Sequence, residues 1–167
     1  NLLAAGVTLN VASAGALTTG GDQAFGDITL SGRIGGAGAL SADSLQANGT
    51  AATVSGNLSL NGAGDATVAD AGRLTVATGG GLSFGSGTFI LGSGSELAYT
   101  RSGNFTLDAF TASGATPAIV THGGNGTLTI NSTLTNVGTL RVNGGGTLDM
   151  SGSAPDLDTL AISGNST

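Results

Sequence analysis

Residues 126–145 read GTLTINSTLTNVGTLRVNGG, and residues 146–165 read GTLDMSGSAPDLDTLAISGN. The two lines align without a gap, and threonine recurs in the same column at Thr127 and Thr147. A period of about 20 residues, built from short alternating runs separated by Gly, Asn and Ser, is typical of a solenoid in which each repeat makes one turn. Five further columns keep an aliphatic residue or Met in both lines: Leu128 and Leu148, Ile130 and Met150, Val137 and Leu157, Leu140 and Leu160, and Val142 and Ile162.

Each line contains three short runs that alternate polar and apolar residues, at 127–130, 132–137 and 139–142 in the first line. Successive side chains of a strand point to opposite faces, so Leu128 and Ile130 can face inward while Thr127 and Thr129 face solvent. Turns stacked at the strand spacing of about 4.8 Å place each inward aliphatic residue on its counterpart in the next turn. The sequence therefore predicts a parallel β-helix with about 20 residues and three short strands per turn, held by these inward columns.

The rest of the chain supports the same interpretation with less regular spacing. Leu74 and Leu97 are 23 positions apart, as are Leu82 and Phe105, and solenoids accommodate such extra residues at their corners. About eight turns fit into the chain, and we predict one domain over residues 1–167. We interpret residues 111–125 as a corner loop or irregular turn. Further strands are predicted at 7–11, 27–31, 52–60, 72–76, 81–84, 87–91, 95–99 and 103–107.

Composition disfavours several other classes of protein. A helical domain is disfavoured because Gly, a poor helix former, occurs 32 times, whereas the good helix formers Glu and Lys occur once and not at all. The absence of Cys excludes disulfides and thiolate metal sites. The net charge of −6 disfavours binding to nucleic acids or anionic lipids, and no run of residues is apolar enough for a membrane span.

Few residues suggest catalysis or cofactor binding. His122 lies alone in VTHGGNG, where it is a candidate general base without catalytic partners, so we expect no catalytic residue and no enzyme. Asp156 and Asp158 in PDLD lie on the same side of an extended segment, where the two carboxylates could share a Ca²⁺ ion. The alternative is that both are solvated corner residues, and we expect no other cofactor.

Sequons for N-glycosylation provide a further candidate set of sites. The motif Asn-X-Ser/Thr marks an acceptor in exported proteins when it lies in an accessible turn. Chance is the competing explanation, because a chain so rich in Asn, Ser and Thr produces about three sequons without selection. The six candidate acceptors are Asn48, Asn57, Asn104, Asn125, Asn131 and Asn165.

Two stretches resemble a known group of exported proteins. GGNGTLTINSTLTNVGTLRVNGGGTLDMSG at 123–152 and GRLTVATGGGLSFGSGTFIL at 72–91 are similar to the shaft repeats of bacterial autotransporter passengers and of filamentous-haemagglutinin-like exoproteins of two-partner secretion. This resemblance implies a right-handed parallel β-helix that is exported through the outer membrane to the bacterial surface or the medium. The NPNG-type motif of two-partner secretion domains is absent, so the resemblance is to the middle of the shaft.

These observations lead to a non-catalytic structural stalk or fibre of a secreted or cell-surface adhesin, active in adhesion or in a biofilm matrix. The first alternative is a filament subunit that polymerises head to tail through uncapped β-helix ends. The second is a β-helix enzyme that degrades polysaccharides. The expected partners are further turns of the same chain or identical copies end to end, together with a host or neighbouring-cell surface, and neither nucleic acid nor membrane.

Overall fold

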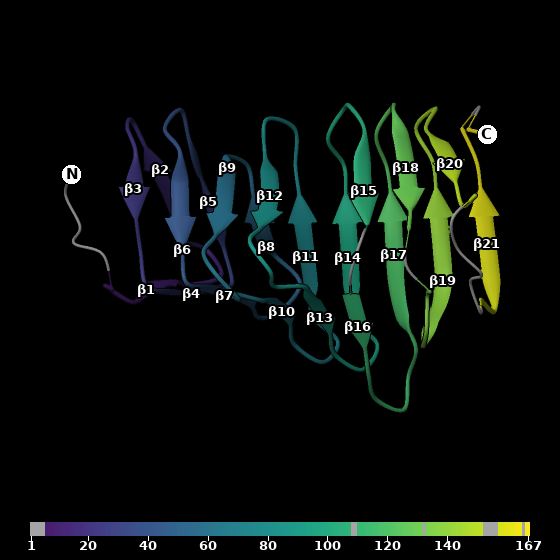
Figure 1. The fold of residues 1–167 in the computed structure, drawn as a ribbon, viewed down its shortest axis with the longest axis horizontal. Coiled ribbons are helices and arrows are strands. Elements are labelled where there is room, and N and C mark those ends of the chain that lie inside the picture. The colour runs from purple at the N-terminus through teal and green to yellow at the C-terminus, as the bar shows by residue number, and fades with distance from the viewer. Residues whose placement is uncertain (1–5, 108–109, 132, 152–156, 165) are drawn as a thin grey trace.

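A computed structural model of the chain describes residues 6–107, 110–131, 133–151, 157–164 and 166–167. These residues form 21 strands and no helix. They wind into a β-solenoid of about seven turns with about 20 residues per turn, slightly fewer turns than the eight predicted (Figure 1). The parallel β-helix predicted from the repeat is thus confirmed.

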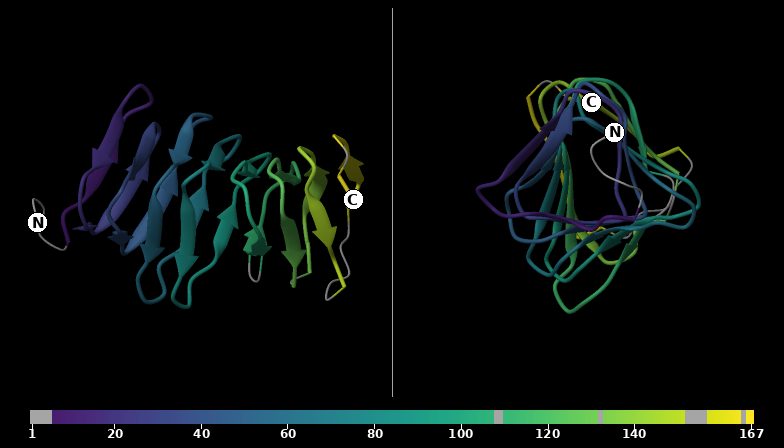
Figure 2. Two further views of the ribbon diagram at one scale, coloured as in Figure 1. Left: turned by 90° about the horizontal axis from the view of Figure 1, so that it is seen from above. Right: turned by 90° about the vertical axis from the view of Figure 1, so that its left-hand side faces the viewer.

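Three faces run along the solenoid and give it a three-sided cross-section (Figure 2). Face A contains β1 (Leu9–Val11), β4 (Asp27–Leu30), β7 (Ser44–Ala47), β10 (Ala66–Val68), β13 (Phe89–Leu91) and β16 (Phe110–Ala112). Face B contains β2 (Ala16–Thr19), β5 (Arg33–Gly36), β8 (Ala52–Val54), β11 (Arg73–Val76), β14 (Glu96–Tyr99), β17 (Ala118–His122), β19 (Val137–Val142) and β21 (Thr159–Ile162).

Face C differs from the other two because it is made of two separate sheets. The first sheet contains β3 (Gln23–Ala24), β6 (Leu40–Ala42), β9 (Asn57–Leu60) and β12 (Gly81–Phe84). The second sheet contains β15 (Phe105–Leu107), β18 (Thr127–Ile130) and β20 (Thr147–Asp149). Faces A and B continue past this point, because β10 pairs with β13 and β11 pairs with β14.

The pairing is parallel, and its register shows where extra residues enter a turn. Leu17 pairs with Ile34 and Leu140 with Leu160, so these turns contain 17 and 20 residues. Leu74 pairs with Leu97, as its spacing of 23 residues suggested. The additional residues lie in the corners, where they leave the ladders intact.

Two predictions about local structure were wrong. Residues 132–137 were expected to form a separate strand, but among the described residues 133–137 only Val137 is in a strand, as the first residue of β19. Asn136 has a left-handed φ of 59°, which interrupts an extended backbone at this residue. Gly138 has no Cα partner in β17, because the register between β17 and β19 shifts there. Residues 111–125 were interpreted as a loop, but they contain most of β16 and all of β17.

The core is a column of buried apolar side chains that point inward from all three faces. Residues in the middle of it, such as Leu74 and Leu97, are fully buried. Stacking also brings the corner backbones of successive turns into close contact, and this contact explains part of the glycine content. A Cβ atom at Gly87 would overlap the Gly64 carbonyl, and one at Gly64 would overlap the Asp43 carbonyl. Side chains larger than hydrogen are therefore excluded from this corner.

Candidate functional surfaces

The predicted inward columns lie in the last turns of the solenoid. Leu128, Ile130, Val137, Leu140 and Val142 are buried, with at most 1% of each exposed. Leu128 pairs with Leu148 and Leu140 with Leu160, while Val142 pairs with Ile162. These residues serve packing, because their side chains fill the core and leave nothing for a ligand to contact.

Exposure increases toward the last described strand. Leu148, Met150 and Leu157 are only partly buried against the core. Leu160 and Ile162 of β21 are each 46% exposed, because no other described strand covers that side of β21. The inward column therefore continues to an open apolar edge.

His122 lies in a strand, although residues 111–125 were interpreted as a corner loop or irregular turn. It is the last residue of β17, it is fully buried, and its Cα partners on face B are Tyr99 and Val142. Its Nε2 lies 3.2 Å from the Gly126 carbonyl oxygen, and its Nδ1 has no hydrogen-bond partner. Because the ring is enclosed in the core, His122 has no access to a substrate on the surface.

The pair of carboxylates considered for Ca²⁺ is only partly described. Asp158 is exposed, and Asp156 lies outside the described residues. Within the part of the chain that the structure describes, no three His, Cys, Asp or Glu side chains gather in a way that could hold a metal ion. The Ser151 backbone N–H donates to Asp149 Oδ1 at 3.0 Å, and this bond lowers the pKa of the exposed carboxyl.

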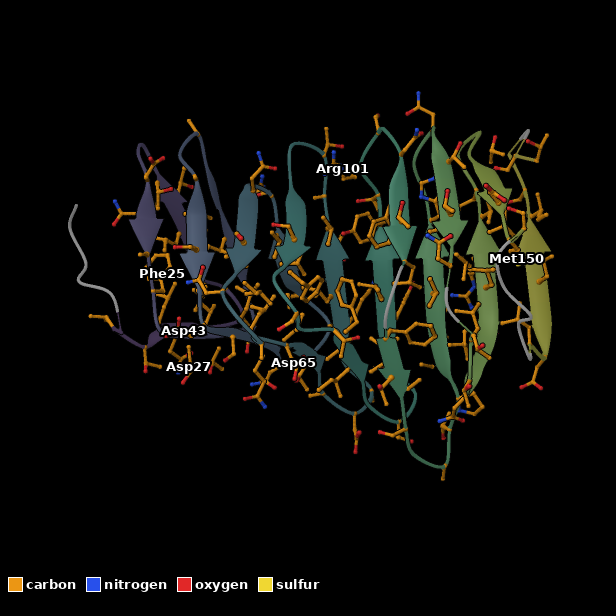
Figure 3. All side chains as sticks on the ribbon, in the orientation of Figure 1. Phe25, Asp27, Asp43, Asp65, Arg101 and Met150 are labelled. Atoms are coloured by element: carbon orange, nitrogen blue, oxygen red, sulfur yellow. The ribbon has the colours of Figure 1, made fainter. Side chains whose placement is uncertain are left out.

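Other aspartates stabilise corners instead of forming a site. Asp27, Asp43 and Asp65 come from successive turns and follow one another along the solenoid near face A (Figure 3). Asp27 accepts a hydrogen bond from the Ser44 hydroxyl at 2.7 Å, and Asp65 accepts one from the Thr88 backbone N–H at 2.9 Å. A hollow of about 760 Å³ is lined by Asp43 and Asp65 among others, but hydrogen bonds between successive turns account for Asp27 and Asp65.

The six sequons are located differently from one another. Asn57, Asn104, Asn125 and Asn131 are exposed, and Asn48 is half-buried. Asn165 lies outside the described residues. The side-chain oxygen of Asn104 accepts a hydrogen bond from the Thr127 backbone N–H at 3.0 Å, so this amide already joins two turns. Glycosylation of the exposed set stays a prediction.

One polar cluster on the outside of face B was not foreseen. Glu96 lies between two turns, with Oε2 3.3 Å from the Arg73 Nε and Oε1 accepting a 2.7 Å hydrogen bond from the Thr121 hydroxyl. The Arg73 side chain is 40% exposed, so the ion pair contributes at most about 1 kcal/mol. In the sequence, the feature that could have indicated this cluster is Glu96 itself, the single Glu of the chain.

The break in face C opens a groove that sequence analysis also missed. Two adjoining hollows of about 400 and 330 Å³ share Leu82, Ser83, Phe105 and Thr106 in their walls. We call them together the seam groove: it lies between β12 and β15, with Arg101 at one end. The further lining residues are Asn57, Leu58, Gly81, Phe84, Gly85, Gly87, Phe89, Tyr99, Asn104 and Leu107.

Aromatic side chains gather around the seam groove. The rings of Tyr99 and Phe105 stack, and the rings of Phe84 and Phe89 meet edge to face with centroids 4.8 Å apart. Burial raises the pKa of the Tyr99 hydroxyl well above its usual range, and the nearby Arg101 charge opposes this rise. The groove therefore combines an apolar floor with a cation.

Comparison of the chain with protein families, with characterised proteins and with solved structures finds no match. None of the described residues belongs to a helix with the length and apolarity to cross a membrane.

Proposed function

We propose that the chain is a non-catalytic structural stalk of a secreted or cell-surface bacterial adhesin. The observation that carries this proposal is the unbroken ladder of face B, in which eight parallel strands from β2 to β21 stack in one direction. A solenoid of this kind holds distance, because each turn contacts only its neighbours and length grows with the number of turns. The function belongs to the stack and not to a particular side chain.

The outer surface suits a stalk that extends into water. Outward positions of the strands are mainly Thr, Ser and Asn, as at Thr53, Thr75 and Ser59, and only 8% of the chain is charged. Such a surface is well hydrated, and its low charge density gives little electrostatic attraction to charged polymers. The resemblance to adhesin shafts adds the bacterial exterior as the proposed location.

Removing one turn tests the stalk directly. Because Ala52 is the Cα partner of Leu74, deleting residues 52–73 joins two equivalent points and removes one coil. We expect the shortened protein to fold and to lose about 4.8 Å of length for each turn removed. Cells that display variants with deleted turns should then attach less well than cells that display the undeleted protein.

Two controls separate the effect of stalk length from the effect of the stalk's surface residues. Thr53→Ser and Thr75→Ser alter the outer surface without changing length, so attachment should be unchanged. An antibody to the chain should label intact cells as strongly as permeabilised ones. Labelling only after permeabilisation, or attachment that ignores turn deletion, would contradict the proposal.

A second candidate is a filament subunit that stacks head to tail through the apolar residues at the uncovered side of β21. Leu160 and Ile162 there are 46% exposed, which is unusual for residues of an inward column. Exposed strand edges readily pair with other strands. The edge would be covered by a further turn of the same polypeptide in a stalk, and by another copy in a filament.

The two candidates differ in the behaviour of the purified 167-residue chain. A filament subunit should give a light-scattering mass that rises above 15.8 kDa with concentration, and the double variant Leu160→Lys with Ile162→Lys should abolish that rise. Arg141→Gln, on an exposed outward residue of neighbouring β19, is the matched control. A constant mass of one chain at all concentrations would exclude the filament.

A further inference from the structure

The seam groove has the geometry of a missing strand. β12 pairs only with β9 and β15 only with β18, so the facing edges of the two sheets have no strand between them in the described chain. Figure 1 shows β12 and β15 standing visibly further apart than β9 and β12 or β15 and β18. The neighbouring faces are continuous at the same level, so the opening is confined to face C.

The edge of β12 directs hydrogen-bonding groups into the groove. In a parallel ladder, the N–H and C=O of one residue point to the same side and alternate along the strand. Gly81 and Gly85 donate to the carbonyls of Gly56 and Leu60, so both face β9. Leu82 and Phe84, which alternate with them, therefore present their N–H and C=O groups to the groove.

The opposite edge is arranged in the same way. The Leu107 carbonyl accepts a hydrogen bond from the Asn131 N–H, so this residue faces β18. Thr106, one residue earlier, therefore presents its N–H and C=O to the groove. Two strand edges with donors and acceptors thus face each other across the opening, as they face a bound strand in β-augmentation.

The floor of the groove is core that has been left partly uncovered. Leu58, Leu60 and Leu128 are each 1% exposed. Their register partners Leu82, Phe84 and Phe105 also point inward, but they are only partly buried. An apolar side chain entering between them would continue the inward columns of face C and bury this surface.

The charge at one end of the groove is positive. Arg101 donates from Nη1 to the Gly80 carbonyl oxygen at 2.6 Å, and its side chain lies beside Gly81 at the start of β12 (Figure 3). Among the described residues that line the groove, Arg101 is the one charged group, although the chain as a whole carries −6. A carboxylate on the occupant would be attracted to this end.

We propose that the seam groove binds an extended strand of a partner polypeptide, which inserts between β12 and β15. This strand would have alternating apolar and polar side chains and a carboxylate near Arg101. Its backbone would bond to Leu82 and Phe84 on one side and to Thr106 on the other. Its apolar side chains would enter the core between Leu82 and Phe105. The addition makes face C a continuous sheet.

A polysaccharide fits these features less well. A sugar chain has no backbone ladder of alternating donors and acceptors to match two strand edges. It would also bring hydroxyl groups against Leu82, Phe84 and Phe105, where they would find few partners. The edges and the apolar floor together favour a peptide.

The test uses fluorescently labelled peptides and the folded 167-residue chain. The probe is Gly-Asn-Leu-Ser-Leu-Asn-Gly, which copies residues 56–62, because Leu58 and Leu60 of β9 already stand in register with Leu82 and Phe84. A second probe carries Asn57→Asp to supply the carboxylate. A scrambled peptide, Leu-Leu-Ser-Asn-Gly-Gly-Asn, keeps the composition without the alternation.

Backbone pairing is tested by N-methyl groups on the Leu-Ser-Leu nitrogens of the probe. We expect fluorescence polarisation to show binding of the alternating probes and a loss of about tenfold or more on N-methylation, because several backbone hydrogen bonds are removed together. Equal binding of the N-methylated or scrambled peptide would overturn the proposal. So would binding of an acidic oligosaccharide probe in place of either peptide.

Variants of the protein localise the site. Thr106→Pro removes an N–H that faces the groove and should weaken both probes, while circular dichroism checks that the coil still melts cooperatively. Arg101→Gln should abolish the preference for the Asp probe over the neutral probe, whereas Arg141→Gln, far along face B, should leave that preference intact. Undiminished binding to a folded Thr106→Pro protein, or no binding of any peptide to the wild type, would refute the assignment.

Discussion

At the scale of single residues, Tyr99 should control stability at high pH. Burial raises the pKa of its hydroxyl above the ordinary value of 10.0, so the folded chain keeps a proton that the unfolded chain loses. The stabilising effect is complete below pH 10 and is lost as the pH rises from there toward the folded pKa. We predict a melting temperature that falls steadily above about pH 10 and falls much less in Tyr99→Phe.

The composition makes this measurement unusually clean. The chain has one Tyr, no Cys and no Lys, and arginine stays charged throughout the range. Absorbance at 295 nm therefore follows Tyr99 alone, with Arg101 as the nearby charge that opposes the shift. An alkaline loss of stability that is identical in Tyr99→Phe would show that another process is responsible.

A second residue-scale prediction concerns glycine at the corners. Gly87→Ala would drive a Cβ into the Gly64 carbonyl, whose backbone cannot move without disturbing the turn below. We expect the free energy of unfolding to fall by about 1–3 kcal/mol, as for overpacked sites. Gly20→Ala is the control, because its Cβ would meet no atom within 4 Å, and urea unfolding should show little change.

At the scale of strands, the alternation of β19 separates packing from surface. Leu140 is fully buried between Val120 and Leu160 of the neighbouring strands, whereas Arg141 points outward and is exposed. Leu140→Ala should lower the free energy of unfolding by about 2–5 kcal/mol, and Arg141→Ala by less than about 0.5 kcal/mol. Equal losses in chemical denaturation would mean that the inward and outward registers have been misassigned.

Strands were predictable where alternation was strong and obscured where a polar residue took an inward place. The runs around Leu74 and Leu97 carry large apolar residues at every second position, and they form β11 and β14 as expected. β17 was overlooked because its last inward position is His122, which reads as polar beside the glycines that follow. The seam groove gave no sequence signal, because Leu82 and Phe105 keep the same 23-residue spacing as residues that do pair.

At the scale of the whole molecule, the solenoid should lose its structure from the ends. Each turn is stabilised by the turns on either side, so a terminal turn has half the contacts of a central one. For the isolated chain of residues 1–167 we predict hydrogen exchange that is fastest in β1 and β21 and slowest around β8 and β11.

The seam groove predicts a departure from that gradient. β12 and β15 are central in sequence, but among the described strands each has a partner on one side only. Their amides that face the groove, at Leu82, Phe84 and Thr106, should therefore exchange faster than those of β11 and β14 in the same turns, and the bound alternating peptide should slow them. Peptide-resolved exchange followed by mass spectrometry measures both effects. Uniform protection across each central turn would mean that face C is closed in solution, and the opening between β12 and β15 would then have no consequence for binding.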